Sequence, residues 1–148
     1  MKNLLFTLLA IFVLSCSGKK QDETQQIEKA KLISKRTLTA ASSLRRDNCS
    51  KSADAAEKAE KFSKRAENSD NFEAIRDNAE IAMDEFEKAA KFSDKCGCKG
   101  AEKLADKGYK FAKKAYRAEN LVDAREYAET ARSSAEDLVS KANNCSYD

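Results

Sequence analysis

The residues with the most distinctive chemistry in this sequence are its five cysteines, two of which form the triplet Cys96-Gly97-Cys98. Vicinal thiolates suit soft metals such as Cu(I), and a Cys-x-Cys pair can carry out thiol–disulfide exchange. The competing interpretation is structural, because Cys49 and Cys96 are separated by the same number of positions as Cys98 and Cys145. We favour disulfides, and we expect neither a metal ligand nor a cofactor.

Histidine is absent from the chain. Its absence removes Ser-His-Asp and Cys-His nucleophile pairs and the imidazole ligands of most zinc and copper sites. The Glu-x-x-His pattern of di-iron helical bundles is also excluded. We therefore expect a protein without catalytic residues that is not an enzyme.

The charged residues are mixed in sign, with a formal net charge of +3. Nucleic-acid binding is not expected, because it requires basic residues concentrated on one face. A basic stripe does recur at Lys58, Lys61 and Lys64 and again at Lys107, Lys110 and Lys113. A solvated helix face is the simplest interpretation, and an acidic protein, a glycan or a lipid headgroup is the functional alternative. Arg76/Glu80 and Arg125/Glu129 have the spacing of ion pairs within a helix.

Three tyrosines form the candidate binding face: Tyr109, Tyr116 and Tyr127. Tyrosine is enriched at protein interfaces, because it offers area and a hydrogen bond at modest entropic cost. Packing against another helix is the alternative role.

These residues lie in a duplicated frame. When the sequence is shifted by the distance from Cys49 to Cys98, Cys49 aligns with Cys98 and Cys96 aligns with Cys145, without a gap. Identical residues then pair as Ala56/Ala105, Lys58/Lys107, Lys61/Lys110, Phe62/Phe111, Lys64/Lys113, Ala66/Ala115, Asn71/Asn120, Arg76/Arg125, Ala79/Ala128, Glu80/Glu129, Ala82/Ala131 and Glu87/Glu136. Apolar residues at steps of three and four in each repeat predict an antiparallel helical hairpin. The sequence also has no proline and only 4 glycines, so the predicted fold class is all-α.

The hairpins predict how the cysteines pair. In an antiparallel hairpin the start of the first helix lies beside the end of the second, which favours Cys49–Cys96 and Cys98–Cys145. The pairing 49–98 with 96–145 also respects the repeat and stays open, whereas a Cys96–Cys98 bond is strained. Gly97 is expected to separate two helices, and Asp70 with Glu73 fits a capping box at the turn of the first hairpin.

One further helix is predicted over residues 25–46, before the hairpin repeats 49–96 and 98–145. The expected architecture is thus about five helices, with residues 25–148 as the helical domain. A membrane-surface role for the helix 25–46 is an alternative, since Lys29, Lys31, Lys35 and Arg36 are all basic.

The first residues predict export. Lys2 is followed by an apolar run over 4–14, which as a helix would rise only about 16 Å, too short to span roughly 30 Å of hydrocarbon. Val13-Leu14-Ser15-Cys16 resembles the lipobox of bacterial lipoproteins. The resemblance implies a signal peptide over 1–15, and lipidation of Cys16 with diacylglycerol and often an acyl chain such as palmitate. It also implies an envelope location, and Ser17 would favour the outer membrane if proteobacterial sorting applies. The polar stretch 16–24 is the expected flexible tether.

The functional expectation is a membrane-anchored, non-catalytic protein-binding or scaffold module facing the periplasm or the cell surface. The alternatives are a thiol-dependent metal-binding or redox factor that uses Cys96 and Cys98, and an immunity or inhibitor lipoprotein.

Overall fold

The computed structural model describes residues 19–145, with side chains from residue 28 onward except residue 30. The described chain is all-α and contains no strand. Its helices are α1 (Lys19–Glu67), α2 (Phe72–Cys96), α3 (Lys99–Arg117) and α4 (Leu121–Asn143). The predicted signal peptide and Cys16 lie outside the described residues, and α1 begins inside the stretch predicted as a tether.

The predicted number of helices is wrong for the described part of the chain, which has four. The segment 25–46 is not a separate helix, since it continues without a break into the first helix of the first hairpin. The junction contains neither glycine nor proline, and Lys51 Nζ lies 2.6 Å from Asp47 Oδ2, an i,i+4 ion pair that supports helix across it. The polar residues near Asp47 therefore do not end α1.

The chain divides into two units, residues 1–41 and 42–148. In the described part of the first unit, Leu32, Ile33 and Leu38 are exposed. None of the helices in residues 19–145 has the length and apolar character needed to cross a membrane.

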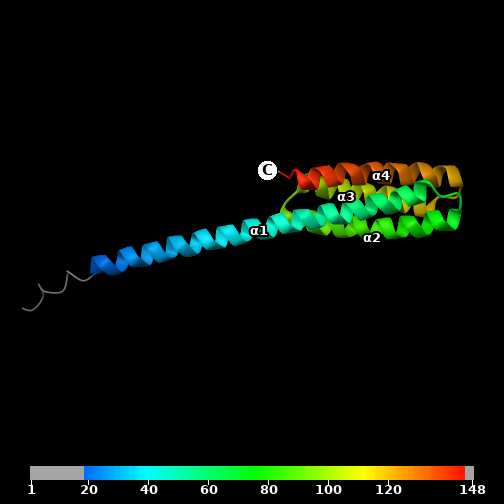
Figure 1. The fold of residues 1–148 in the computed structure, drawn as a ribbon. Helices are drawn as coiled ribbons and strands as arrows, with labels where there is room; N and C mark the ends of the chain where they lie inside the picture. The colour runs from blue at the N-terminus through cyan, green and yellow to red at the C-terminus, as the bar shows by residue number, and fades with distance from the viewer. Residues whose placement is uncertain (1–18, 146–148) are drawn as a thin grey trace, which may run out of the picture. The chain divides into compact units, whose positions relative to one another are not determined.

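The second unit is an antiparallel four-helix bundle. Its hairpin 1 (49–96) consists of the end of α1 with α2, and its hairpin 2 (98–145) consists of α3 with α4. The α1–α2 and α3–α4 turns lie at one end of the bundle, here called the loop end, and the α2–α3 connection lies at the other (Figure 1). Gly97 forms that connection as the C-cap of α2 with φ 77°, which is favourable for glycine and costly for other residues.

The bundle core consists mainly of alanine, and its largest fully buried side chains are Phe86, Ile75 and Leu138. Alanine allows the helices to approach closely but buries little apolar area for each residue. Gly108 extends this pattern, because a Cβ at that position would fall on the ring of Phe86. The absence of a side chain at Gly108 therefore makes room for the largest residue of the core.

Two disulfides join the helices at the end opposite the turns, as predicted. The Cα–Cα distance is 5.5 Å for Cys49–Cys96 and 6.0 Å for Cys98–Cys145, both within the normal range for a disulfide. The alternative pairing 49–98 with 96–145 is not the one observed.

The N-caps of α2 and α4 are repeat-equivalent asparagines. The Asn71 side chain accepts from the backbone N–H of Glu73, and the Asn120 side chain accepts from that of Asp123. The predicted Asp70–Glu73 capping box is wrong, because the cap lies one residue later and Asp70 instead forms an ion pair with Arg125.

Candidate functional site

An open surface hollow lies near the loop end of each hairpin, and the two hollows fall at corresponding positions of the repeat. The hairpin 1 basic surface is lined by Glu57, Glu60, Lys61, Lys64, Arg65, Asn68 and Ser69. The hairpin 2 basic surface is lined by Lys110, Lys113, Lys114, Arg117, Ala118, Glu119, Asn120, Asp123 and Tyr127. Two lysines of each predicted basic stripe therefore line equivalent hollows: Lys61 and Lys64 in hairpin 1, and Lys110 and Lys113 in hairpin 2.

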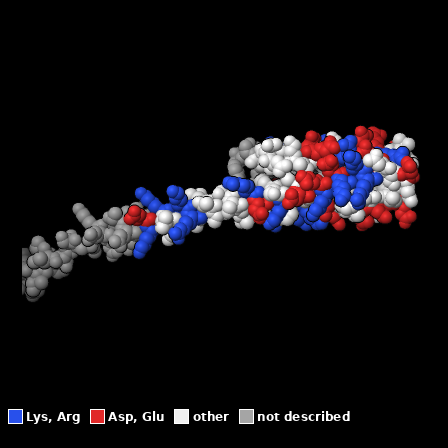
Figure 2. Space-filling view, in the orientation of Figure 1, with Lys and Arg blue, Asp and Glu red and all other residues white. Residues whose placement is uncertain are grey.

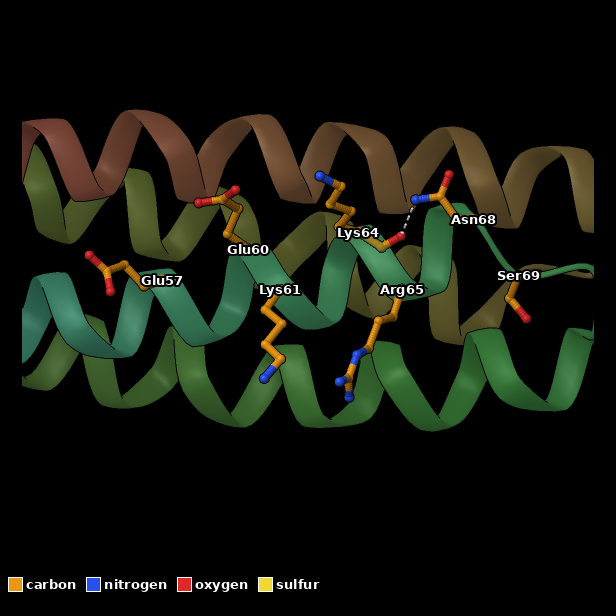
Figure 3. Close-up of a pocket in the computed structure, with 7 residues that line it drawn as sticks. All are labelled: Glu57, Glu60, Lys61, Lys64, Arg65, Asn68 and Ser69. Atoms are coloured by element: carbon orange, nitrogen blue, oxygen red, sulfur yellow. Dashed lines mark hydrogen bonds between the residues drawn. The ribbon is translucent and has the colours of Figure 1, made fainter.

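The hairpin 1 basic surface comes from one helix and the turn that follows it. Lys61 and Arg65 extend to one side of α1, whereas Glu60 and Lys64 lie toward the other (Figure 3). Asn68 Nδ2 donates to the Lys64 carbonyl at 2.8 Å, which ends the helix locally. These basic groups diverge and do not surround a common point.

The hairpin 2 basic surface differs because two helices and their turn build it. Tyr127 of α4 packs beside Phe111 of α3, with ring centroids 6.5 Å apart. Lys114 Nζ lies 4.9 Å from the Phe111 centroid and 5.4 Å from the Tyr127 centroid. These cation–π contacts hold the Lys114 ammonium over an aromatic pair at the edge of the hollow.

Basic side chains outnumber carboxylates on both surfaces. None of them forms an ion pair with another residue of the described chain. Four cations and two carboxylates line the hairpin 2 basic surface, while three cations and two carboxylates line that of hairpin 1. Figure 2 shows both signs interspersed over the face of the bundle in view, with a group of basic side chains toward the loop end. A local positive field is therefore present on a surface of mixed charge.

Two arginines hold the turns in place, by contacts between the hairpins. Arg76 Nη2 of hairpin 1 donates to the Ala118 carbonyl at 3.5 Å, and Arg125 Nε of hairpin 2 donates to the Ser69 carbonyl at 2.9 Å. Arg76 corresponds to Arg125 in the repeat, and Ser69 corresponds to Ala118, so the contacts are reciprocal. The predicted Arg76/Glu80 and Arg125/Glu129 pairs are not among the ion pairs of the described residues.

A third arginine connects α4 to α1. Arg132 Nε donates to Glu67 Oε2 at 2.7 Å, and Arg132 also forms an ion pair with Glu136. The hydrogen bond that Arg132 donates to the Glu67 carboxylate is the main cause that raises the pKa of Arg132 above its ordinary value. The repeat-equivalent positions hold Tyr116 and Met83, which cannot form an ion pair. The Glu67–Arg132 pair is therefore not repeated.

The three tyrosines of the predicted binding face do not share one environment. Tyr127 belongs to the hairpin 2 basic surface, and Tyr116 is 37% exposed. Tyr109 is partly buried against the core, with Lys113 Nζ 5.7 Å from its ring centroid. Tyr109 and Phe111 are two positions apart and so face nearly opposite sides of α3. The structure thus places Tyr109 away from the Phe111–Tyr127 pair.

Cys96 and Cys98 are each bonded to a partner in their own hairpin. Neither is a free thiol, so metal binding or redox exchange at the triplet would first require reduction. Among the described residues, no group of three or more acidic or cysteine side chains is placed to hold a metal ion.

Sequence reasoning found the cysteines and the lysines but missed the reciprocal arginine contacts. The signal that could have revealed them is the identity of Arg76 and Arg125 across the repeat. Comparisons of the chain with protein-family models, with curated proteins and with solved structures give no match.

Proposed function

We propose that this chain is a lipid-anchored protein of the bacterial envelope that acts as a non-catalytic binding or scaffold module. The observation that carries the proposal is the loop end of the bundle, where basic side chains without ion-pair partners recur in both hairpins. Positive charge that is not paired with a carboxylate of the same chain is available to a partner of opposite charge.

The bundle is suited to binding because its surface is held in place. Two disulfides close one end, and the asparagine caps and reciprocal arginine contacts order the turns at the other. A surface that is ordered before binding loses less conformational entropy when a partner docks.

The position of the chain entry also favours this end. Within the bundle, α1 passes Cys49 at the disulfide end and finishes at Glu67 beside the turns. The segment that leads back to Cys16 therefore joins the bundle at the end opposite the turns. Along the chain, an anchor at Cys16 is therefore connected to the end of the bundle that does not carry the basic surfaces.

The anchor is tested by metabolic labelling with a palmitate analogue and by membrane fractionation of the full chain. Wild-type protein is expected to incorporate the label and to sediment with membranes, and Cys16→Ser is expected to lose the label. Label retained in Cys16→Ser would refute lipidation at this residue.

The binding role is tested by photocross-linking in cells. A photoreactive residue at Lys110 should capture a discrete partner band, and one at the repeat-equivalent Lys61 tests the surface of the other hairpin in the same way. A companion variant, Tyr109→Ala with Tyr116→Ala, tests whether the tyrosines extend the contact. Absence of a specific band from both lysine positions would refute binding at the loop end.

An immunity or inhibitor lipoprotein that sequesters a secreted toxin or enzyme is one version of the same proposal. A thiol-dependent factor receives no comparable support, since both cysteines of the triplet are in disulfides.

A further inference from the structure

We infer that the hairpin 2 basic surface is a binding site for an acidic segment of a protein partner, and that the hairpin 1 basic surface is its inactive counterpart. The inference rests on the proposed binding function and specifies its site and the chemistry of its ligand. Its evidence is a comparison of the residues at equivalent positions of the two hairpins, some of which are identical and some of which differ.

The two surfaces share Lys61/Lys110 and Lys64/Lys113 but differ at the positions beside them. Where hairpin 2 has Arg117, hairpin 1 has Asn68, whose side chain is used in a bond to its own helix. Where hairpin 2 has Tyr127, hairpin 1 has Asn78, whose amide donates to the Ala74 carbonyl at 2.7 Å. At these two positions hairpin 2 has a cation and an aromatic ring. In hairpin 1 the same positions hold asparagines whose side chains are bonded to their own helices.

Most cations of the hairpin 2 basic surface are arranged as a row. Lys110, Lys114 and Arg117 follow one another at steps of four and three along one side of α3, over a rise of about 10 Å. Lys113 lies beside this row, with its ammonium over the Tyr109 ring. Carboxylates spaced along a peptide can pair with such a row one after another. Tyr127 and Phe111 add apolar surface beneath Lys114, on which the aliphatic part of a glutamate or its neighbour can pack.

A compact anion such as phosphate fits this hollow less well. The natural place for such an anion would be the N-terminus of α4, where free backbone N–H groups and the helix dipole favour negative charge. Asn120 already accepts a backbone N–H there, and the Asp123 carboxylate, bonded to the Asn120 amide at 2.8 Å, puts negative charge on the same turn. The remaining positive charge lies along α3, where it suits an extended acidic chain.

The test uses matched charge reversals in the full chain. The first variant is Lys110→Glu with Lys114→Glu, and the control is Lys61→Glu with Arg65→Glu at the equivalent positions. Both variants change the net charge equally, and both replace a cation that contacts the equivalent phenylalanine ring. Circular dichroism melting checks that each variant folds.

The probe is a fluorescein-labelled peptide of about ten glutamates, which when extended exceeds the length of the row at about 3.3 Å for each residue. Anisotropy at low salt is expected to show binding that the hairpin 2 variant weakens about tenfold, and the hairpin 1 variant less than about twofold. Equal weakening in both variants would overturn the inference, because it would show attraction to net charge alone.

Two further measurements do not depend on the variants. Adding the peptide to wild-type protein should shift the ring NMR signals of Tyr127 and Phe111, and unchanged signals would overturn the site. Vesicles of phosphatidylglycerol should not compete with the peptide, and competition lost in the hairpin 2 variant would identify a lipid headgroup as the ligand instead. If the peptide fails to bind while cross-linking at Lys110 succeeds, this inference falls and the proposed function stands.

Discussion

The two hairpins share one frame of disulfides, caps and alanines, but they fill the bundle core differently. Hairpin 1 buries the hydroxyls of Ser52, Ser63 and Ser93, where hairpin 2 has Ala101, Ala112 and Ala142. A hydrogen bond of 2.7 Å joins Ser52 to Ser93, and Ser52 also donates to the Ala89 carbonyl. Hairpin 1 thus holds part of its helix pair by polar contacts, while hairpin 2 relies there on close packing.

The large core residues are also exchanged between the hairpins. Phe86 of hairpin 1 packs over Gly108 of hairpin 2, whereas the equivalent pair is Ala135 with Ala59. In the same way Leu138 of hairpin 2 corresponds to Ala89 of hairpin 1. A repeat can therefore diverge in volume at single positions if a neighbour from the other hairpin compensates.

The largest expected effect comes from removing the disulfides one at a time. Cys49→Ala with Cys96→Ala and Cys98→Ala with Cys145→Ala each open a loop with the same sequence separation of 47. The chain-entropy model then predicts a loss of roughly 4 kcal/mol in either case. Denaturant unfolding of the two variants measures both losses. A clearly smaller loss in hairpin 1 would show that the Ser52–Ser93 contact replaces much of its disulfide.

The exchange of volume between the hairpins is tested at Gly108. Alanine normally stabilises a helix interior by about 1 kcal/mol over glycine. We expect Gly108→Ala to destabilise the bundle by about 2 kcal/mol instead, because its Cβ would meet the Phe86 ring. Thermal unfolding gives the sign directly.

The control for that change is a double-mutant cycle with Phe86→Ala. Removing the ring costs about 4 kcal/mol alone, but in that background Gly108→Ala should become stabilising. If Gly108→Ala is destabilising to the same degree in both backgrounds, the compensation between the two positions does not exist.

A smaller effect of opposite sign is expected at Ser63. Its hydroxyl is buried and has no hydrogen-bond partner among the described residues. Ser63→Ala should therefore stabilise the bundle by about 1 kcal/mol, because an unpaired buried polar group is removed. Ala112→Ser, the reverse change in hairpin 2, should destabilise it by a similar amount. Loss of stability in Ser63→Ala would mean that the hydroxyl has a partner.

The smallest effects concern the reciprocal arginines. Arg125→Ala should cost about 1 kcal/mol, since Arg125 bonds the Ser69 carbonyl and pairs with Asp70. Arg76→Ala should cost only a few tenths of a kcal/mol, because its bond to Ala118 is longer. Hydrogen exchange of the two turns reports each effect locally. If the two variants lose the same amount of protection at their respective turns, the expected difference between Arg125 and Arg76 is contradicted.

Much of the fold could be predicted from local pattern. The spacing of the cysteines predicted both disulfides, because antiparallel helices bring the ends of each hairpin together. The break between the hairpins at Gly97 could also be predicted, since a left-handed C-cap favours glycine. The limit of α1 could not be predicted, because the polar junction near Asp47 is compatible with both a break and a continuous helix.

The candidate site was only half predictable. The duplicated lysines could be read from the repeat, but their divergence in hairpin 1 and their alignment beside Tyr127 in hairpin 2 depend on side-chain directions and on a second helix. Arg125 illustrates the same limit, because its partners lie 55 or more positions away in the sequence, on the turn of the other hairpin.

The sequence by itself determined the helical class, the two hairpins and the glycine between them, because each follows from local periodicity or from helix-capping preference. It favoured the observed pairing of the cysteines, but equal spacing also allowed 49–98 with 96–145, and the structure decided between the two. Only the tertiary structure decided which repeat-equivalent residues became contacts and which stayed free. Those choices depend on packing between the hairpins, where Phe86 needs the space at Gly108 and each turn receives a hydrogen bond from an arginine of the other hairpin.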